Sequence, residues 1–285
     1  MTLLQILILA IVQGAAELLP VSSSAHVIVA EKLMGLDPTA PEMTLLLVML
    51  HTGTMFAVIF FFWKTWKENF FLSREVFWET VKYIFAATLL TGAVGLTLKF
   101  LIEKLFMKDI PHAEIELLFG NMSLISASLA IVGLLILYAG IKSRSDLYSR
   151  APLRMKESCL IGAVQGLCLP FRGFSRSGAT ISAGLLMGIS RQKLEAFSFA
   201  LAVVLTPPVI AREVLRLLHQ QHASSSSNMA QIFMPSLLGM AFSFVAGLFA
   251  LKWLSSWLEN GRWPLFGIYC LAASAVVFTL HQNGY

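Results

Sequence analysis

The sequence predicts an all-α integral membrane protein, built as an inverted-topology repeat with six spanning helices and two re-entrant helical hairpins. Composition is the first reason: 57% of the 285 residues are hydrophobic, 13% are charged, and the mean hydropathy is +0.75, which is typical of a chain that folds in lipid. The second reason is a segment that occurs twice, with Gln13 of the first copy corresponding to Gln165 of the second. The third is a set of apolar stretches of the length that a bilayer requires.

Each copy of the repeated segment consists of two short apolar half-helices with a break between them. The copies run over 11–35 and 163–188, and both contain Gln-Gly followed by a proline and a serine cluster. A half-helix of about ten residues is too short to cross the hydrocarbon core. We therefore expect the regions 3–35 and 158–188 to form hairpins that enter the membrane and leave it on the same side.

Six stretches outside the hairpins are apolar over roughly the ~20 residues that a spanning helix needs. They are 43–63, 81–101, 118–141, 196–216, 232–252 and 264–281. Each half of the chain then has one hairpin and three spans, and an odd number of crossings turns the second half upside down relative to the first. The prediction is one membrane domain over 1–285, with repeat 1 at about 1–141 and repeat 2 at about 158–281.

The distribution of basic residues predicts the orientation in the membrane. Thirteen of the 21 Lys and Arg fall in loops assigned to one side, at 64–82, 142–157, 189–195 and 252–262. By the positive-inside rule these loops face the cytoplasm, and both termini lie outside it. The first hairpin then enters from the periplasmic face and the second from the cytoplasmic face, so that their turns meet near the midplane.

Composition and spacing argue against several other classes of protein. Although the sequence pI is near 9.2, the basic residues occur singly, without the patch expected of a nucleic-acid-binding protein. Residues 1–16 lack the basic start of a signal peptide, and the repeated segment continues through the position of cleavage. Cys159, Cys168 and Cys270 have no metal-ligand spacing and are expected to be inert packing residues.

The first hairpin turn brings a carboxylate, hydroxyls and an imidazole together. Gln13 and Glu17 are four residues apart, on one face of a helix that Pro20 brings to an end. The serines from Ser22 to Ser24 follow where the second half-helix begins, and the amides at such a helix start form a site for phosphate. His26 lies within the next turn on much the same side. A hydroxyl, an imidazole and a carboxylate are therefore expected to converge.

The second hairpin turn carries the opposite charge. The segment from Pro170 to Thr180 contains two arginines, and Arg176 presents a planar fork of donors that matches phosphate oxygens. Ser175 is placed to cap the following half-helix. Arg172 is explained equally well by a contact with lipid headgroups on the cytoplasmic side. The turn as a whole is predicted to bind an anion.

Structural roles remain open for several of these residues. The serines are explained by helix capping alone, His26 by packing in the core, and Gln13 by hydrogen bonds to the hairpin backbone. Glu17 is harder to explain in this way, because a buried carboxylate needs a cation or a proton, and an ion pair with Arg176 is the simplest alternative to catalysis. His51 is expected to make an interhelical hydrogen bond in a closely packed span.

Three segments carry a resemblance to a known family. Residues 13–17, 20–26 and 173–180 resemble the signature segments of the undecaprenyl-diphosphate phosphatase family, the bacitracin-resistance phosphatases of bacterial cell-wall synthesis, and the similarity extends over nearly the whole chain. Two positions depart from the family pattern. Gln13 removes one carboxylate, which weakens a two-carboxylate metal site, and Arg172 stands where the family more often has proline.

The resemblance implies a multi-pass enzyme of the bacterial inner membrane, with its site open to the periplasm, that removes the terminal phosphate of undecaprenyl diphosphate. Ser23, or a water beside it, is expected to attack the phosphorus, with His26 as general base, Arg176 as the cation, and Glu17 orienting His26 or binding metal. The expected metal is Mg2+ or Ca2+, held by Glu17 with Gln13. The phosphate contacts are expected from Gln13, Ser22, Ser24, Arg172, Ser175, Ser177 and Thr180.

A lipid-phosphate transporter or flippase is the alternative from another class. Inverted repeats with broken helices are common in secondary transporters, and fold alone does not separate the two. A pure transporter needs to bind an anion but has no need of a nucleophile and a base. Oligomeric state is left open by the sequence, with a homodimer as one alternative.

Overall fold

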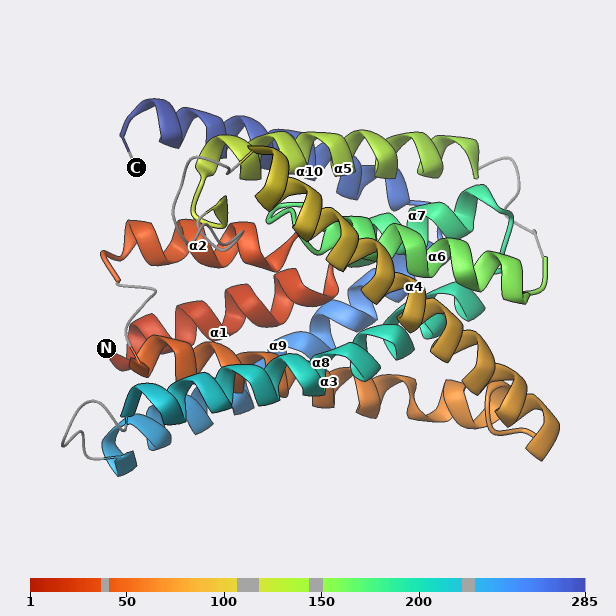
Figure 1. The fold of residues 1–285 in the computed structure, drawn as a ribbon, viewed down its shortest axis with the longest axis horizontal. Helices are drawn as coiled ribbons and strands as arrows, with labels where there is room; N and C mark the ends of the chain where they lie inside the picture. Colours follow the sequence, from red (N-terminus) through yellow and green to blue (C-terminus); the bar gives the residue numbers. More distant parts are fainter. Residues whose placement is uncertain (37–40, 107–117, 144–150, 222–228, 285) are drawn as a thin grey trace.

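The computed structural model describes residues 1–36, 41–106, 118–143, 151–221 and 229–284, and within these ranges the chain is helical (Figure 1). Outside the helices the described β structure is a single isolated bridge between Ala151 and Ile189. The all-α prediction is therefore confirmed. The helices are α1 (Leu3–Leu18), α2 (Ser23–Leu33), α3 (Pro41–Asn69), α4 (Arg74–Phe106), α5 (Met122–Lys142), α6 (Met155–Cys168), α7 (Arg176–Leu186), α8 (Arg191–Gln221), α9 (Met229–Glu259) and α10 (Trp263–Gln282).

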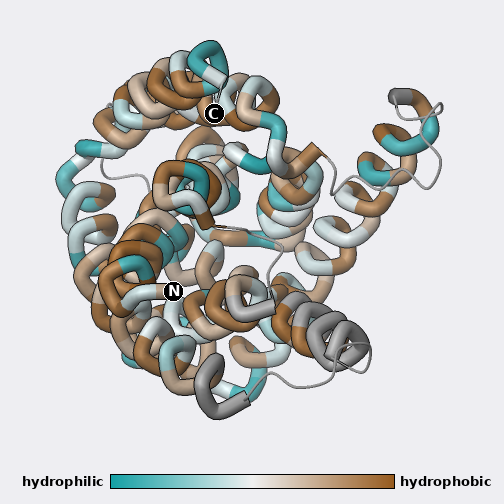
Figure 2. Tube along the Cα trace, turned by 90° about the vertical axis from the view of Figure 1, so that its left-hand side faces the viewer, coloured by the Kyte–Doolittle hydropathy of each residue, from teal (hydrophilic) through white to brown (hydrophobic). Residues whose placement is uncertain are grey.

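Five helices in the described ranges are long and apolar enough to cross a membrane. They lie at Met43–Asn69, Arg74–Leu105, Met122–Lys142, Phe233–Glu259 and Trp263–Gln282, and each coincides with a predicted span. The sixth predicted span, 196–216, falls within α8, whose side chains are described only in part. Hydrophobic residues occur along all the helices (Figure 2), and many large ones are exposed on the outside of the bundle, which suits a multi-pass membrane protein.

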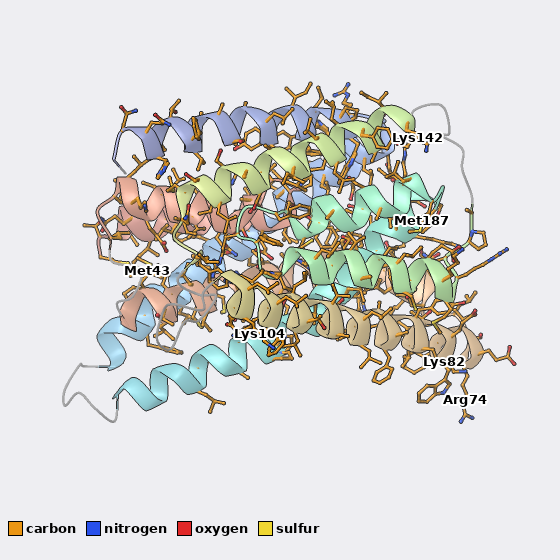
Figure 3. The ribbon with its side chains drawn as sticks, turned by 45° about the horizontal axis from the view of Figure 1, so that its top comes forward. Met43, Arg74, Lys82, Lys104, Lys142 and Met187 are labelled. Carbon is orange, nitrogen blue, oxygen red and sulfur yellow. The ribbon has the colours of Figure 1, made fainter. Side chains whose placement is uncertain are left out.

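Two helical hairpins enter the bundle from opposite ends (Figure 1). The outer ends of α1 and α2 lie at the end that carries both termini, and the turn that joins them lies in the interior. The outer ends of α6 and α7 lie at the other end, where Arg74, Lys82 and Lys142 are also found (Figure 3). The two interior turns approach each other in the middle of the molecule.

The backbone conformation between Leu19 and Ser22 determines the geometry of the first hairpin turn. α1 ends at Leu19, which is extended (φ −75°, ψ 152°), directly before Pro20. Ser22 then adopts φ +68° and is the only described residue other than glycine with a positive φ. A left-handed conformation is unfavourable for a residue with a Cβ and persists only where its surroundings hold it. The strained turn allows α2 to start at Ser23 and run back along α1.

Each hairpin packs against a helix of the other half of the chain. On α1, a Cβ added at Gly14 would lie 2.7 Å from the Ser243 carbonyl oxygen of α9. On α6, a Cβ added at Gly166 would lie 2.8 Å from the Thr91 carbonyl oxygen of α4. Because 14 and 166, like 91 and 243, are 152 positions apart, these are the same contact in the two halves. Only glycine permits so close an approach of backbones.

Candidate active site at the two hairpin turns

Both hairpin turns line a single polar cavity of about 110 Å³. The predicted meeting of the two turns is therefore found in the structure. α1 and α2 contribute one wall, and the start of α7 with the residue pair before it contributes the other. The lining residues are Ala16, Glu17, Ser22, Ser23, Ser24, Phe174, Ser175, Arg176 and Ser177.

The Glu17 carboxylate is the centre of the contacts in this cavity. Its Oε2 accepts hydrogen bonds from the Ser23 hydroxyl at 2.5 Å and from the Gln13 side-chain amide at 3.3 Å. Its Oε1 lies 3.3 Å from a guanidinium nitrogen of Arg176. His51 Nε2, from α3, lies 3.9 Å from Oε2. A carboxylate, a hydroxyl and a guanidinium are thus held together from three helices.

Arg176 opens α7 and points back across the cavity to the first hairpin. Ser175 fixes this geometry, because its side chain caps α7 by accepting a hydrogen bond from the Gly178 amide at 3.2 Å. The Glu17 and Arg176 side chains are 21% and 22% exposed, so that their attraction is less screened than at a protein surface. The guanidinium has five N–H donors, and one contact with Glu17 leaves it able to take part in binding a phosphate.

The two turns are also joined by hydrogen bonds between hydroxyls and backbone. Ser24 Oγ, which lies 3.2 Å from Ser22 Oγ, accepts from the Gly173 amide at 3.5 Å. Ser177 Oγ donates to the Leu19 carbonyl at 3.4 Å. These bonds are long, and they hold the turns side by side without filling the cavity between them.

Both ring nitrogens of His26 have partners other than the Glu17 carboxylate. Its Nδ1 lies 2.8 Å from the Ser22 carbonyl and its Nε2 lies 2.7 Å from the Tyr269 hydroxyl of α10, with the two rings stacked. Because a carbonyl only accepts, Nδ1 donates, and in the neutral ring Nε2 accepts from Tyr269. The expected contact of Glu17 with His26 is not made in this structure. The hydrogen bond from His26 Nδ1 to the Ser22 carbonyl instead supports the strained backbone of Ser22.

Three of the predicted phosphate contacts are not among the residues that line the cavity: Gln13, which instead donates to Glu17, Thr180 and Arg172. Thr180 is fully buried, and its hydroxyl lies 2.7 Å from that of Ser198 in α8. Arg172 is exposed, and its guanidinium lies over the ring of Phe119 at 4.6 Å. The structure therefore places Thr180 in the packing of α7 and Arg172 beside the cavity rather than in it.

Sequence reasoning missed His51 and Tyr269 as neighbours of the site. His51 was expected to bond between helices for packing, whereas its described partners are the Leu47 carbonyl of its own helix and Glu17. Tyr269 is 243 positions from its partner His26, so that no local spacing connects them. A lone histidine within an apolar span was the available signal for His51, since ionisable residues there indicate function by default.

The side chains of the cavity do not by themselves provide a suitable set of ligands for a divalent metal ion. In the described ranges no group of three or more His, Cys, Asp and Glu side chains comes together. The single carboxylate, Glu17, already has Arg176 on one oxygen and Ser23 and Gln13 on the other. Mg2+ and Ca2+ need several oxygen ligands, and Gln13 supplies an amide where a second carboxylate would be needed.

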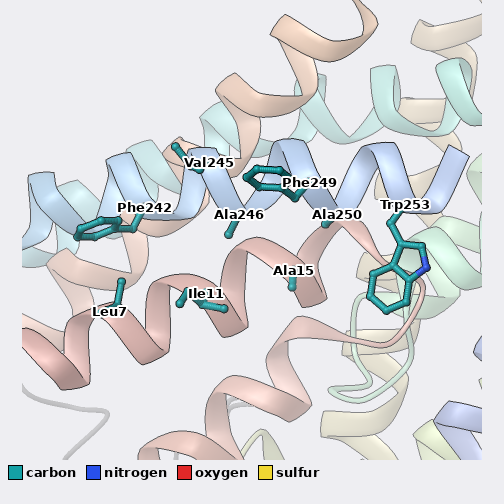
Figure 4. Close-up of a pocket in the computed structure, with 9 residues that line it drawn as sticks. All are labelled: Leu7, Ile11, Ala15, Phe242, Val245, Ala246, Phe249, Ala250 and Trp253. Carbon is teal, nitrogen blue, oxygen red and sulfur yellow. The ribbon is translucent and has the colours of Figure 1, made fainter. Parts of the chain in front are cut away.

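An apolar groove of about 410 Å³ runs between α1 and α9 (Figure 4). Its lining is almost entirely hydrophobic, and Ala15 at one end is followed in the chain by Ala16 and Glu17 of the polar cavity. The groove and the cavity are therefore adjacent along α1. The lining residues are Leu7, Ile11, Ala15, Phe242, Val245, Ala246, Phe249, Ala250 and Trp253.

Comparison with known proteins gives a consistent result over almost the whole chain. The family model described as bacitracin resistance protein BacA matches residues 6–276. The chain is 59% identical over 283 residues to undecaprenyl-diphosphatase 2 of Acinetobacter baylyi, with 98% of each chain covered. It is 33% identical to an undecaprenyl-diphosphatase of Gluconacetobacter diazotrophicus, with 98% and 96% covered, and 30% identical to one of Rhodopirellula baltica, with 98% of each covered.

Proposed function

The chain belongs to the bacitracin resistance protein BacA family, and we propose that it is an undecaprenyl-diphosphatase, which hydrolyses undecaprenyl diphosphate to undecaprenyl phosphate and inorganic phosphate. The observation that carries the proposal is the cavity in which the Ser23 hydroxyl, the Glu17 carboxylate and the Arg176 guanidinium meet. These groups supply a nucleophile, a proton acceptor and a cation, which phosphoryl transfer requires. A protein that only carries a lipid phosphate needs the cation alone.

Arg176 and the helix starts bind the terminal phosphate. α7 begins at Arg176, so that the guanidinium and the positive end of the helix dipole act on the same anion. The start of α2 lies opposite, and Ser22 makes no side-chain cap bond there, so that the first amides of α2 can also face phosphate oxygens. Charge that develops on these oxygens in the transition state is stabilised by donors that are already in position.

Ser23 is the nucleophile in this proposal, and Glu17 takes its proton. As the bond from Ser23 Oγ to the terminal phosphorus forms, the hydroxyl proton moves to Glu17 Oε2, 2.5 Å away, and the bond to undecaprenyl phosphate breaks. Water then attacks the phosphoserine, and inorganic phosphate leaves while Ser23 regains a proton. In the alternative, a water held by Ser23 attacks directly and Glu17 accepts the proton of that water.

His26 supports the turn in this proposal. For it to act as general base, its ring would have to leave Tyr269 and the Ser22 carbonyl, which now hold both nitrogens. Replacing Tyr269 by Phe distinguishes the roles, because it frees Nε2 and would raise turnover only if His26 were the base.

The prenyl chain of the substrate lies along the groove between α1 and α9 in this proposal. The groove is apolar, residues that line it such as Ile11 and Phe249 are exposed on the outside of the molecule, and it adjoins the polar cavity through Ala15 and Ala16. A diphosphate in the cavity can therefore extend its chain into the groove without crossing polar surface. Burial of the chain there adds hydrophobic binding energy that a short prenyl diphosphate would lack.

The membrane arrangement belongs to the same proposal. We take α3, α4, α5, α8, α9 and α10 as six spans and the pairs α1–α2 and α6–α7 as re-entrant hairpins, in the inner membrane of a bacterium with the cavity open to the periplasm. This orientation is supported by Arg74, Lys82 and Lys142, which lie at the same end of the bundle (Figure 3). A single cysteine at Asn283 should react with an impermeant maleimide from outside, and one at Lys82 should not.

Phosphate release by the purified protein in detergent tests the proposed function. Detergent leaves no separate compartments, so that a transporter would give no product. We expect phosphate from undecaprenyl diphosphate at a rate that depends on Arg176. A purified, folded protein that releases none would contradict the proposal and favour the transporter.

A chelator in the same assay tests the expected Mg2+ or Ca2+. Because the protein offers one paired carboxylate, an ion can be held here only with oxygens of the substrate itself. Loss of turnover in chelator, restored by one of the two ions, would support that form of the site. Turnover that is insensitive to chelator would leave Arg176 and the helix starts as the source of positive charge.

A further inference from the structure

His51 approaches the Glu17 carboxylate from a fourth helix. It projects from α3, and its Nε2 lies 3.9 Å from Glu17 Oε2, the same oxygen that accepts from Ser23 and Gln13. The His51 side chain is 41% exposed, which is high for a residue whose role is core packing. α3 is held firmly beside it, because the Ser243 hydroxyl of α9 donates to the Leu50 carbonyl at 2.9 Å.

The hydrogen bonds of His51 determine which ring nitrogen carries a proton. Nδ1 lies 2.7 Å from the Leu47 carbonyl of the same helix. A carbonyl can only accept, so that Nδ1 must donate. Nε2 then faces a carboxylate oxygen, which also accepts unless it is protonated. A stable contact between Nε2 and Oε2 therefore requires a proton or a bridging water between them.

We propose that His51 is a positioning residue for Glu17 in the phosphatase reaction. From Nε2, directly or through one water, it donates to Oε2 and holds this oxygen toward Ser23, while Arg176 holds Oε1. The inference rests on the proposed function, because it assigns His51 to the carboxylate that accepts the Ser23 proton. The other groups that contact Oε2, the Ser23 hydroxyl and the Gln13 amide, are both neutral, so that His51 is the one described neighbour of this oxygen that can bear positive charge.

A matched pair of variants separates this role from a structural one. In His51→Asn the amide can keep the bond to the Leu47 carbonyl, but it is too short to reach Glu17. In His51→Gln the amide can reach Glu17, but it gives up the geometry of Nδ1. We expect His51→Asn to lower kcat about 10-fold or more with KM changed less than about threefold, and His51→Gln to stay within about threefold of the wild type in kcat.

Two further measurements complete the test with undecaprenyl diphosphate in detergent. In a Glu17→Gln background, His51→Asn should cost at most about a further twofold, because residues that act through each other are not additive. Thr52→Val is the control, since Thr52 donates to the Val48 carbonyl on the same helix at 2.8 Å and should leave kcat unchanged.

Each remaining outcome counts against the inference. If His51→Asn retains the wild-type kcat and His51→Gln does not, the role of His51 is its hydrogen bond to the Leu47 carbonyl. A full additive loss of kcat on adding His51→Asn to Glu17→Gln would also overturn the positioning role. Equal loss in both variants with a lowered melting temperature would make His51 a packing residue. Failure of the proposed function gives a different result, because the wild type would then release no more phosphate than Arg176→Ala.

Discussion

The two hairpins share one frame and use equivalent residues in opposite ways. Ser23 and Ser175 are 152 positions apart, and each lies at the start of the second half-helix. Ser175 accepts from the Gly178 amide and caps α7, whereas Ser23 donates to Glu17. The hydroxyl of Ser175 is therefore tied to its helix, while that of Ser23 is held by a carboxylate inside the cavity.

The glutamines of the two copies differ in the same manner. Gln13 donates to Glu17 at 3.3 Å, and its equivalent Gln165 donates to the Thr91 hydroxyl of α4 at 3.1 Å. The position equivalent to Glu17 is Leu169, which is half exposed. One copy thus supplies a carboxylate and a hydroxyl, the other supplies a guanidinium, and both turns line the same cavity.

Removal of the cation from the second hairpin should have the largest effect. Replacement of Arg176 by alanine removes the positive charge that we propose offsets the phosphate oxygens, and it leaves Glu17 without its ion pair. We expect phosphate release to fall about 10⁴-fold. Arg172→Ala is the control, because Arg172 lies outside the cavity lining, and a similar loss there would show that the two arginines are not distinct.

Exchange of the equivalent serines for alanine tests the comparison directly. Ser23→Ala should lower turnover about 10³-fold without lowering the melting temperature. Ser175→Ala should lose the helix cap, which costs about 1 kcal/mol of stability, with a much smaller loss of turnover. Mass spectrometry after an acid quench should find phosphate on Ser23. Turnover that survives in Ser23→Ala would assign the attack to water.

A second carboxylate on the first hairpin should lower the rate of turnover. In Gln13→Glu two carboxylates would share the space around Oε2 of Glu17, and their repulsion would favour protonation of one of them. We expect turnover to fall about 10-fold without added metal, which corresponds to one pKa unit. Recovery with Mg2+ or Ca2+ would show that the second acid creates a metal site. An increase in turnover without metal would contradict this account of Glu17.

Obstruction of the apolar groove should have the smallest effect, and only on binding. Ile11→Trp fills the groove beside α1, so that KM for undecaprenyl diphosphate should rise about fivefold, or roughly 1 kcal/mol, with kcat little changed. A short prenyl diphosphate should be unaffected. Leu167→Trp on the exposed face of α6, the counterpart of α1, is the control. Equal effects on long and short substrates would place the chain elsewhere.

The sequence predicted the frame of the molecule and the meeting of the turns. Apolar length located the helices, and proline, serine and glycine located the turns, because these signals are local in the chain. The contacts of His26 and His51 were not predictable in this way. The packing of α10 determines the partner of His26, and the packing of α3 determines that of His51. Ser22 has a positive φ and does not cap α2 with its side chain, although its spacing in the sequence predicts that role.

The packing of α1 on α9 has a consequence for biosynthesis. The close contact of Gly14 with the Ser243 carbonyl joins the start of the chain to a helix that the ribosome makes almost last. Until α9 has emerged, the first hairpin lacks the α9 surface against which α1 packs in the folded protein. The nascent protein is therefore inert through most of its synthesis, and two separately expressed halves should become active only when they are made in the same cell.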